Sequence, residues 1–271
     1  MKTTQRLLVV FAAALVILSS TGCNKLKARD HLNKGVQAYK NSKFEQAIDH
    51  FQQAVALDPT LINARLYLAT AFAQQYIPGA DTPDNNRFGE QAIDQYKQVL
   101  QVDPKNINSI KGIAYLYLQM KKFLLSKEFY KKASEADPND PEPYYSVAVI
   151  DWTQTYVPRQ EERAKLGMKP DESLPAKDKK VCATMKEQNT ANVQEGIDNL
   201  NKALQLRPDY DDAMAYMNLM FRERADIQCD DPAARSADLK AADEWVDKTM
   251  ATKKAKAEKQ PAGAIVMDQN K

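Results

Sequence analysis

Four similar segments of the sequence decide the fold: AIDHFQQAVALDP (Ala47–Pro59), AIDQYKQVLQVDP (Ala92–Pro104), SKEFYKKASEADP (Ser126–Pro138) and GIDNLNKALQLRP (Gly196–Pro208). Each starts with a small residue, has an aromatic residue or leucine four places on, and ends in proline. These spacings put the apolar side chains on one face of a helix. Because the residue before a proline is disfavoured in helical geometry, the prolines end each helix at the same phase. The sequence therefore predicts a repeated amphipathic helix.

The distances between the closing prolines give the length of the repeat. Pro59, Pro104, Pro138 and Pro208 are 45, 34 and 70 residues apart. A period of 34 residues resembles the tetratricopeptide repeat, a helical hairpin. The first repeat carries that family's pattern at Gly35, Ala47, Phe51, Ala54 and Pro59, and small alanines stand at the glycine position of the next three repeats, Ala69, Ala114 and Ala148. This resemblance implies an all-α fold, a right-handed superhelix of about five helical hairpins.

The two longer spacings exceed one repeat by 11 and 36 residues, which indicates insertions. We expect repeats near residues 28–61, 62–106, 107–140, 141–210 and 211–250. The insertions are expected in the turns within repeats, which stack along one edge of the superhelix together with the CDDP turn of the fifth hairpin.

The expected helix ends follow from this layout. In the second repeat, the insertion at 77–88 separates a helix ending at Tyr76 from one resuming near Gly89. In the fourth repeat, the first helix is expected to end at Tyr156 and the second to start near Asn192. A flexible tail is expected over residues 251–271.

The first 22 residues have the composition of an export signal. Lys2 and Arg6 precede an apolar run of 12 residues, 7–18, which is followed by small residues. A transmembrane helix needs roughly 20 residues, so the run is short for a membrane span, and a retained transmembrane anchor is the alternative.

The end of this segment resembles that of a bacterial lipoprotein signal, because Gly22 is followed by Cys23. The resemblance implies that residues 1–22 form a removable signal peptide, that Cys23 is lipidated, and that 23–27 form a lipidated linker. More than one acyl chain on Cys23 would anchor the protein stably to a membrane. Asn24, where aspartate would indicate inner-membrane retention, favours the outer membrane, with the protein facing the periplasm.

Composition and charge exclude several classes of protein. Hydrophobic residues make up 44% of the chain and there are only 8 glycines, which favours long helices. The net charge of +2 comes from Lys2 and Arg6, since residues 23–271 contain 36 basic and 36 acidic residues. A neutral chain gives no reason to expect nucleic acid as a partner, because that usually requires a clustered basic face.

Two cysteines remain besides Cys23. Cys182 and Cys229 fall in turns of adjacent repeats on the same expected edge. Because an exported protein meets an oxidising compartment, we expect a disulfide between them, with two free thiols as the alternative.

The sequence offers no catalytic constellation, so no enzymatic activity is expected. A serine or cysteine nucleophile needs a nearby base, and the two histidines, His31 and His50, both lie in the first repeat. There is no glycine-rich phosphate loop and no cysteine pair with metal-ligand spacing. We therefore expect no cofactor and no metal site.

The resemblance also implies a peptide-binding groove lined by the first helix of each hairpin. Its expected lining residues are Leu32, Val36, Tyr39, Leu66, Thr70, Lys111, Tyr115, Leu118, Tyr145, Val149 and Trp152. Aromatic and aliphatic anchors with few charges suit an extended or helical peptide. The alternative is that some of them, Trp152 above all, pack under the long insertion or the last helix.

These observations lead to one interpretation and one alternative. The chain is expected to be a membrane-anchored scaffold or adaptor that binds other envelope proteins or peptide segments. The alternative is a periplasmic binding module for a small molecule or a polysaccharide.

Overall fold

The structure is a computed structural model that describes residues 23–169 and 172–259. Over these residues it contains helices and connecting turns and no strands, so the predicted all-α class is confirmed. The chain divides after Lys132 into two compact units. The predicted signal peptide, residues 1–22, lies outside the described residues.

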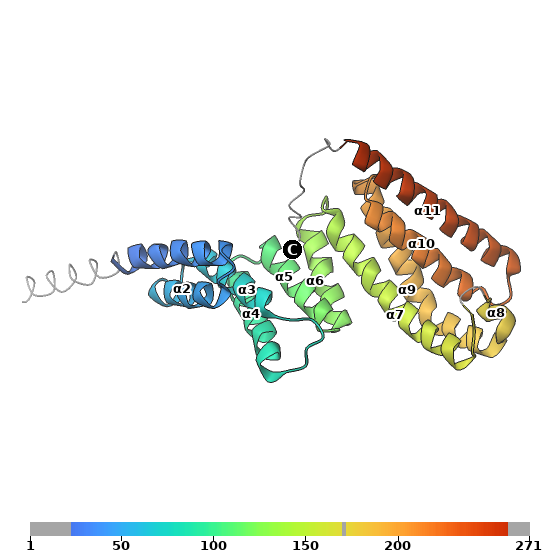
Figure 1. The fold of residues 1–271 in the computed structure, drawn as a ribbon, viewed down its shortest axis with the longest axis horizontal. Helices are drawn as coiled ribbons and strands as arrows, with labels where there is room; N and C mark the ends of the chain where they lie inside the picture. The colour runs from blue at the N-terminus through green and yellow to red at the C-terminus, as the bar shows by residue number, and fades with distance from the viewer. Residues whose placement is uncertain (1–22, 170–171, 260–271) are drawn as a thin grey trace, which may run out of the picture. The chain divides into compact units, whose positions relative to one another are not determined.

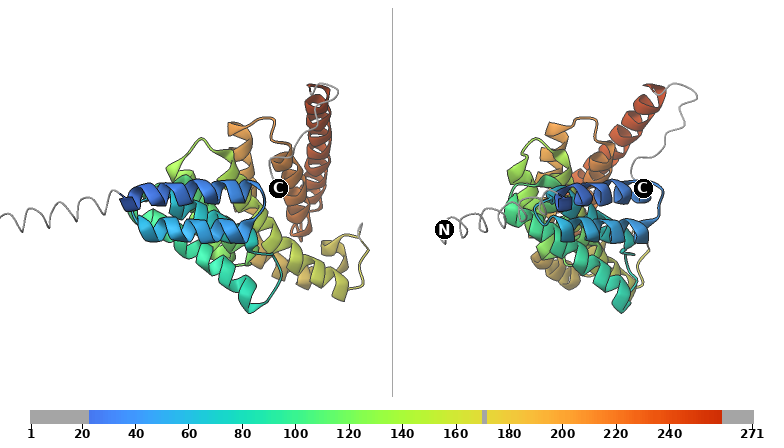
Figure 2. Two further views of the ribbon diagram at one scale, coloured as in Figure 1. Left: turned by 60° about the vertical axis from the view of Figure 1, so that its left-hand side comes forward. Right: turned by 90° about the vertical axis from the view of Figure 1, so that its left-hand side faces the viewer.

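The first unit consists of consecutive helical hairpins (Figure 1). A helix over residues 23–40 pairs with α2 (Phe44–Leu57), and the two lie side by side in both views of Figure 2. Next come α3 (Ile62–Gln75) and α4 (Pro83–Val102), which form the second hairpin. Then α5 (Ile107–Gln119) is followed by α6 (Phe123–Ala136). Each new hairpin packs on the previous one, since α2 contacts α3 and α4 contacts α5.

The second unit contains two longer hairpins. In the first, α7 (Pro141–Lys165) pairs with α9 (Lys179–Leu206), and the short α8 (Leu174–Lys177) lies between them in the chain. In the second, α10 (Asp211–Asp226) pairs with α11 (Pro232–Lys259). Because α10 packs against both α7 and α9, the two hairpins share one core.

The repeated positions that predicted the fold are buried as expected. The small residue Ala47, the aromatic Phe51 and the alanine Ala54 of the first segment are all 0% exposed. The same holds for the equivalent Leu200 and Ala203 of the last segment. A Cβ added to Gly35 would lie 2.5 Å from Cε1 of Phe51, so this glycine is needed for close helix packing.

The prolines end the helices as predicted. Two short turns, at Ser42 and Lys121, connect the helices of their hairpins and share one backbone geometry. Ser42 and Lys121 have positive φ angles of 58° and 57°. In the first turn the amide of Lys43 donates to the Ala38 carbonyl, and in the second the amide of Lys122 donates to that of Tyr117. This is the Schellman geometry that ends a helix through one left-handed residue.

The irregular loop in the insertion of the second repeat is shorter than predicted, because part of the insertion is helical. Helix α4 begins at Pro83 rather than near Gly89, because Thr82 caps it by accepting a hydrogen bond from the Asn85 amide. Residues 76–82 therefore form the irregular part of the insertion, and residues 83–88 add helical turns to α4.

The insertion of the fourth repeat is mostly helix, which corrects the predicted helix ends. Helix α7 continues past Tyr156 and through Pro158 to Lys165, and α9 starts at Lys179, well before Asn192. Proline removes one helical hydrogen bond, but it does not end a helix that tertiary contacts hold beyond it. Leu174 of α8 is 0% exposed in the core of the unit, so the insertion is packed structure.

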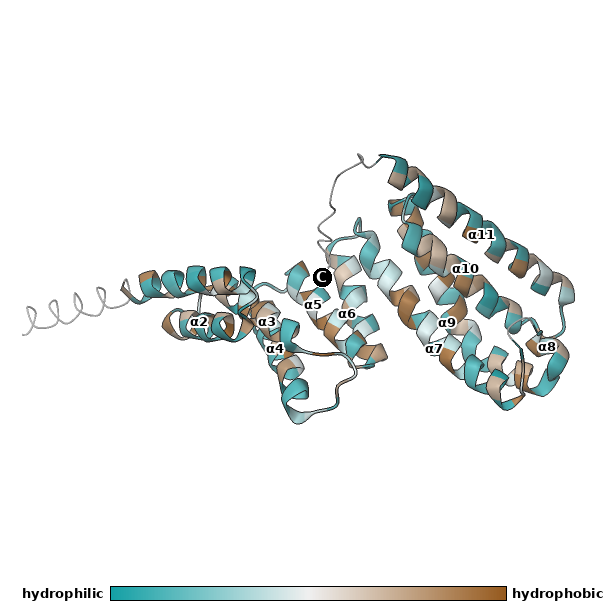
Figure 3. Ribbon diagram, viewed as in Figure 1, coloured by the Kyte–Doolittle hydropathy of each residue, from teal (hydrophilic) through white to brown (hydrophobic). Residues whose placement is uncertain are grey.

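Two terminal predictions also change. Residues 23–27, expected as a linker, are already helical, and α11 continues to Lys259, so residues 251–259 of the expected tail are helix. Residues 260–271 lie outside the described residues. Helix α11 is coloured hydrophilic over much of its length (Figure 3), and its buried residues are Asp238, Ala242 and Thr249.

Candidate functional site

The expected groove residues of the first unit lie on the first helices of its hairpins, and none of them is buried. Tyr115 is the most open aromatic among them, with 51% of its surface exposed. Thr70 forms hydrogen bonds within its own hairpin: its hydroxyl donates to the Leu66 carbonyl at 2.9 Å and lies 3.2 Å from the Tyr96 hydroxyl. The other partly exposed positions are Leu32, Val36, Tyr39, Leu66, Lys111 and Leu118.

The expected groove residues of the second unit, Tyr145, Val149 and Trp152, are all partly exposed on α7. Trp152 stacks on Tyr156 with ring centroids 4.6 Å apart, and it meets Tyr216 of α10 edge-on at 5.5 Å. The rings that Trp152 contacts therefore lie on its own helix and on α10, and its side chain also packs against the core of the second unit, which includes Leu174 of the insertion.

These rings form one continuous array across α7 and α10. Tyr145 contacts Tyr216 at 5.5 Å and Tyr210 at 5.0 Å between ring centroids. We call Tyr145, Trp152, Tyr156, Tyr210 and Tyr216 the aromatic array. The predicted groove contained only Tyr145 and Trp152. Tyr216 joins them because α10 crosses α7 at this point, which a repeat pattern in the sequence does not reveal.

Carboxylates lie near Tyr145 and Tyr210 of the aromatic array. Burial raises the pKa of Tyr145, and Tyr216 and Asp212 raise it further. Burial likewise raises the pKa of Tyr210 to about 12, with Arg207 acting in the opposite direction and Glu142 and Asp212 adding to the rise. Asp212 is exposed in the first turn of α10.

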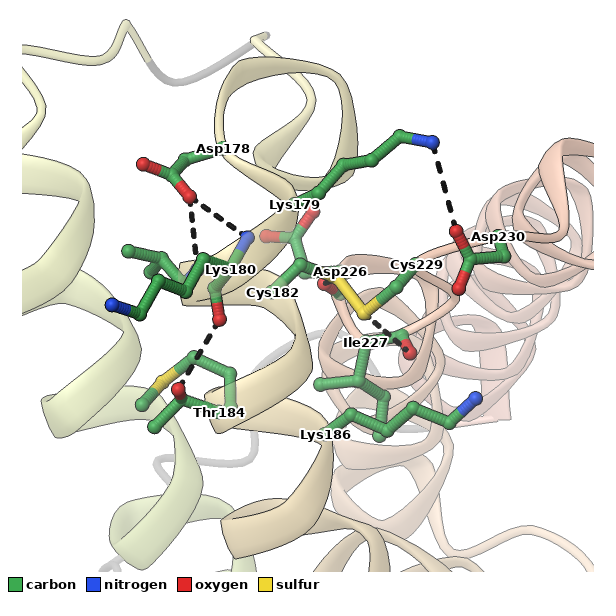
Figure 4. Close-up of a disulfide and its surroundings, with 12 residues drawn as sticks. Asp178, Lys179, Lys180, Cys182, Thr184, Lys186, Asp226, Ile227, Cys229 and Asp230 are labelled. Carbon is green, nitrogen blue, oxygen red and sulfur yellow. Dashed lines mark hydrogen bonds and ion pairs between the residues drawn. A yellow bond between two sulfur atoms is a disulfide. The ribbon is translucent and has the colours of Figure 1, made fainter.

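The predicted disulfide is present: Cys182 of α9 is bonded to Cys229 in the turn between α10 and α11 (Figure 4). The Cα atoms of the two cysteines are 5.7 Å apart and the bond closes a sequence separation of 47 residues. Figure 4 also shows Lys179 and Asp230 facing each other across the bond, with an N–O distance of 3.7 Å. The predicted pairing is therefore found, but Cys182 lies in the first turns of α9 rather than in a loop, so the disulfide ties α9 to the turn between α10 and α11.

A buried ionic cluster lies beside this turn and was not predicted. Arg159 of α7 reaches Glu223 at 2.9 Å and Asp226 at 2.7 Å, both on α10. Arg163 lies 3.3 Å from Asp226, and it also donates to the carbonyls of Lys169 at 2.5 Å and Glu172 at 3.0 Å. The cluster explains why α7 continues past Pro158, because both arginines lie in that extension.

A surface pocket of about 460 Å³ lies at the insertion of the first unit. Asp81, Glu90 and Lys121 give it charged walls of both signs, while Tyr76 and Met120 give it apolar ones. Asn85 closes the insertion loop beside it: its side chain donates to the carbonyls of Ile77 and Ala80 and accepts from the Ile77 amide.

The described residues form neither a metal site nor a membrane span. In the described part of the chain, no group of three or more histidine, cysteine, aspartate or glutamate side chains is placed to hold a metal ion. His31 and His50 lie side by side with their Nδ1 atoms 3.3 Å apart. No helix over residues 23–169 or 172–259 is long and apolar enough to cross a membrane. Cys23, the expected lipidation site, is exposed.

Solved structures with the same fold are distant in sequence. The crystal structure of MamA protein is 11% identical, with a TM-score of 0.58, and the match covers 87% of this chain and 97% of that one. MamA 41-end from Desulfovibrio magneticus RS-1 is 16% identical, with a TM-score of 0.56 and coverage of 84% and 96%. At these identities the likeness concerns the fold alone. No curated protein sequence matches the chain.

Two segments match known sequence families directly. Both families are described as tetratricopeptide repeat, and they match residues 28–61 and 112–140, within the first and third expected repeats. Such repeats are protein-binding modules, so the general function is that of a scaffold for protein–protein interactions. Together with the helical hairpins and the repeat spacing, the matches show that the chain contains tetratricopeptide repeats at residues 28–61 and 112–140.

Proposed function

We propose that this protein is a lipid-anchored scaffold of the bacterial cell envelope, held at the outer membrane and facing the periplasm, which binds peptide segments of other envelope proteins. The observation that carries the binding role is the set of partly exposed aromatic side chains on first helices, Tyr115 in one unit and the aromatic array in the other. Aromatic side chains dominate the energy of most protein interfaces.

The envelope location has separate support. Disulfides persist mainly in oxidising compartments, and Cys182 and Cys229 are bonded. Residues 1–22 have the composition of an export signal, and Cys23 follows it directly. Labelling cells with a radioactive fatty acid tests the anchor: we expect label in the wild-type chain and none in Cys23→Ser. Equal label in both chains would contradict lipidation at Cys23.

Site-specific photo-crosslinking tests the binding role. A photoreactive residue at Tyr115 should capture partner proteins in living cells, while the same residue at Leu124, which is 80% exposed, serves as the surface control. Capture of the same proteins in equal amounts at both positions would contradict binding through the first helices.

The alternative, a module that binds a small molecule or a polysaccharide, would use the pocket beside the second-repeat insertion. Its charged and apolar walls could hold a small polar ligand. This alternative predicts saturable binding of such a ligand without a protein partner, lost in Glu90→Gln and Lys121→Gln.

A further inference from the structure

We infer that the aromatic array of α7 and α10 is a binding site for a cationic side chain, lysine or arginine, carried by a partner peptide. This inference rests on the proposed scaffold function and specifies its ligand. The positive group of that peptide lies over the rings of Tyr145 and Tyr216, which contact each other.

The two ends of the array already hold cations of the chain itself. The guanidinium of Arg207 lies over the Tyr210 ring, 4.5 Å from its centroid, and that of Arg159 lies 5.5 Å from the centroid of Tyr156. Positive groups over aromatic faces are attracted by the negative charge of the ring face. These contacts show that both ends of the array have the geometry for a cation.

The centre of the array has the same rings without such a cation. Tyr145 and Tyr216 meet edge to face, with ring planes at 87°, and both remain partly exposed. Among the described residues, no lysine or arginine lies over either ring. A perpendicular pair of rings offers a face to the charged end of a long side chain and an edge to its alkyl stem.

The charge beside the centre has the complementary sign. Asp212 is exposed and acts electrostatically on Tyr145, Tyr210 and Tyr216, and it forms no ion pair with another described residue. Its neighbour Asp211, in contrast, is paired with Lys256 at 2.5 Å. A free carboxylate next to exposed rings favours a lysine or arginine and disfavours an acidic or phosphorylated segment.

The test uses the fluorescence of Trp152 in the full chain purified in detergent, with Trp245→Phe as background so that Trp152 is the single reporter. The probe is the blocked peptide Ac-Ala-Leu-Lys-Ala-Leu-Lys-Ala-NH2. Its comparison is the same peptide with both lysines acetylated. We expect saturable binding of the first, and a loss of affinity of about tenfold or more on acetylation.

Variants locate the site. Asp212→Asn should weaken binding of the lysine peptide by about threefold to tenfold, whereas Asp247→Asn, an exposed aspartate on α11, should leave it unchanged. Both variants should keep the wild-type melting temperature, because both side chains are exposed. Equal affinity for the two peptides, or an unchanged affinity in Asp212→Asn, would overturn the inference.

Failure of this inference is distinguishable from failure of the proposed function. If partners crosslink at Tyr115 but the lysine peptide does not bind, the scaffold role stands and the cation site is wrong. If the peptide binds with the expected dependence on Asp212 while no partner crosslinks in cells, the cation site stands and the scaffold role is wrong.

Discussion

Arg159 of α7 and Glu223 of α10 form an ion pair of 2.9 Å across 64 residues of sequence, in a site where Glu223 is only 2% exposed. Taking a carboxylate out of water is costly, and Arg159 offsets only part of that cost because it also binds Asp226. Burial therefore raises the pKa of Glu223 from 4.5 to about 7, even though Arg159 acts to lower it.

Stability should accordingly fall with rising pH through this group. The pKa of Glu223 is higher in the folded than in the unfolded state, so the folded state binds the proton more tightly. Its contribution is fully present below about pH 4.5 and is lost as the pH rises to 7, by roughly 3 kcal/mol at most. Denaturant unfolding at pH 5, 6, 7 and 8 measures how the free energy of unfolding changes with pH. Glu223→Gln should make this free energy less dependent on pH, whereas Glu244→Gln, an exposed control on α11, should not. The same pH dependence in the wild type and both variants would contradict this assignment.

Reduction of the disulfide should destabilise the second unit. A bond that closes a separation of 47 residues restricts the unfolded chain, and its removal should cost about 4 kcal/mol on entropic grounds. Thermal unfolding of the wild type with and without reductant, and of Cys182→Ser/Cys229→Ser, measures the effect. Cys23→Ser should respond to reductant as the wild type does. An unchanged melting temperature on reduction would show that the bond adds no stability.

Gly35→Ala should destabilise the first hairpin. The new Cβ would lie 2.5 Å from the Phe51 ring, and such overpacking costs about 1–3 kcal/mol, part of which the better helix propensity of alanine offsets. Phe51→Leu should rescue the glycine variant in part, because it removes the clashing ring atoms. A double-mutant cycle measured by urea unfolding decides the matter, and strictly additive effects would mean that the two positions do not meet.

Asn85→Ala should open the insertion of the second repeat. The buried amide of Asn85 makes three hydrogen bonds to the backbone of Ile77 and Ala80, and the substitution removes all three and leaves those partly buried backbone groups without this partner. The expected cost is about 2–4 kcal/mol. Asn86→Ala, the exposed neighbour, should cost under about 0.5 kcal/mol. Faster hydrogen exchange at residues 76–82 in Asn85→Ala alone would locate the change, and equal exchange in both variants would contradict it.

The repeat pattern predicted the fold because its positions are those that touch within a hairpin. Phe51 and Ala54 are buried against their neighbours at offsets that any amphipathic helix would show, and Pro59 and Pro208 end helices by local sterics. The pairing of Cys182 with Cys229 was also predictable, because the repeat places the two neighbouring intra-repeat segments side by side, although Cys182 lies in helix α9 and not in a turn.

The extent of α7 was not predictable from the same information. Pro158 is a local signal for a helix end, but Arg159 and Arg163 hold the helix beyond it through partners on α10. Likewise, Tyr216 enters the aromatic array only because α10 crosses α7 there. Both features depend on contacts between elements that are distant in sequence, and the periodicity of the sequence does not predict such contacts.

The proposed scaffold binds its partners through the exposed and partly exposed aromatic residues of first helices. The test is to crosslink living cells, purify the lipidated protein and compare the partner proteins recovered with the wild type and with the variant Tyr115→Ala/Tyr145→Ala/Trp152→Ala. Circular dichroism first shows that the variant is folded. The matched control is Leu124→Ala/Val102→Ala, which removes exposed apolar side chains from second helices. We predict that partner proteins recovered with the wild type and the control are lost in the aromatic variant; their full retention in that variant would contradict the account.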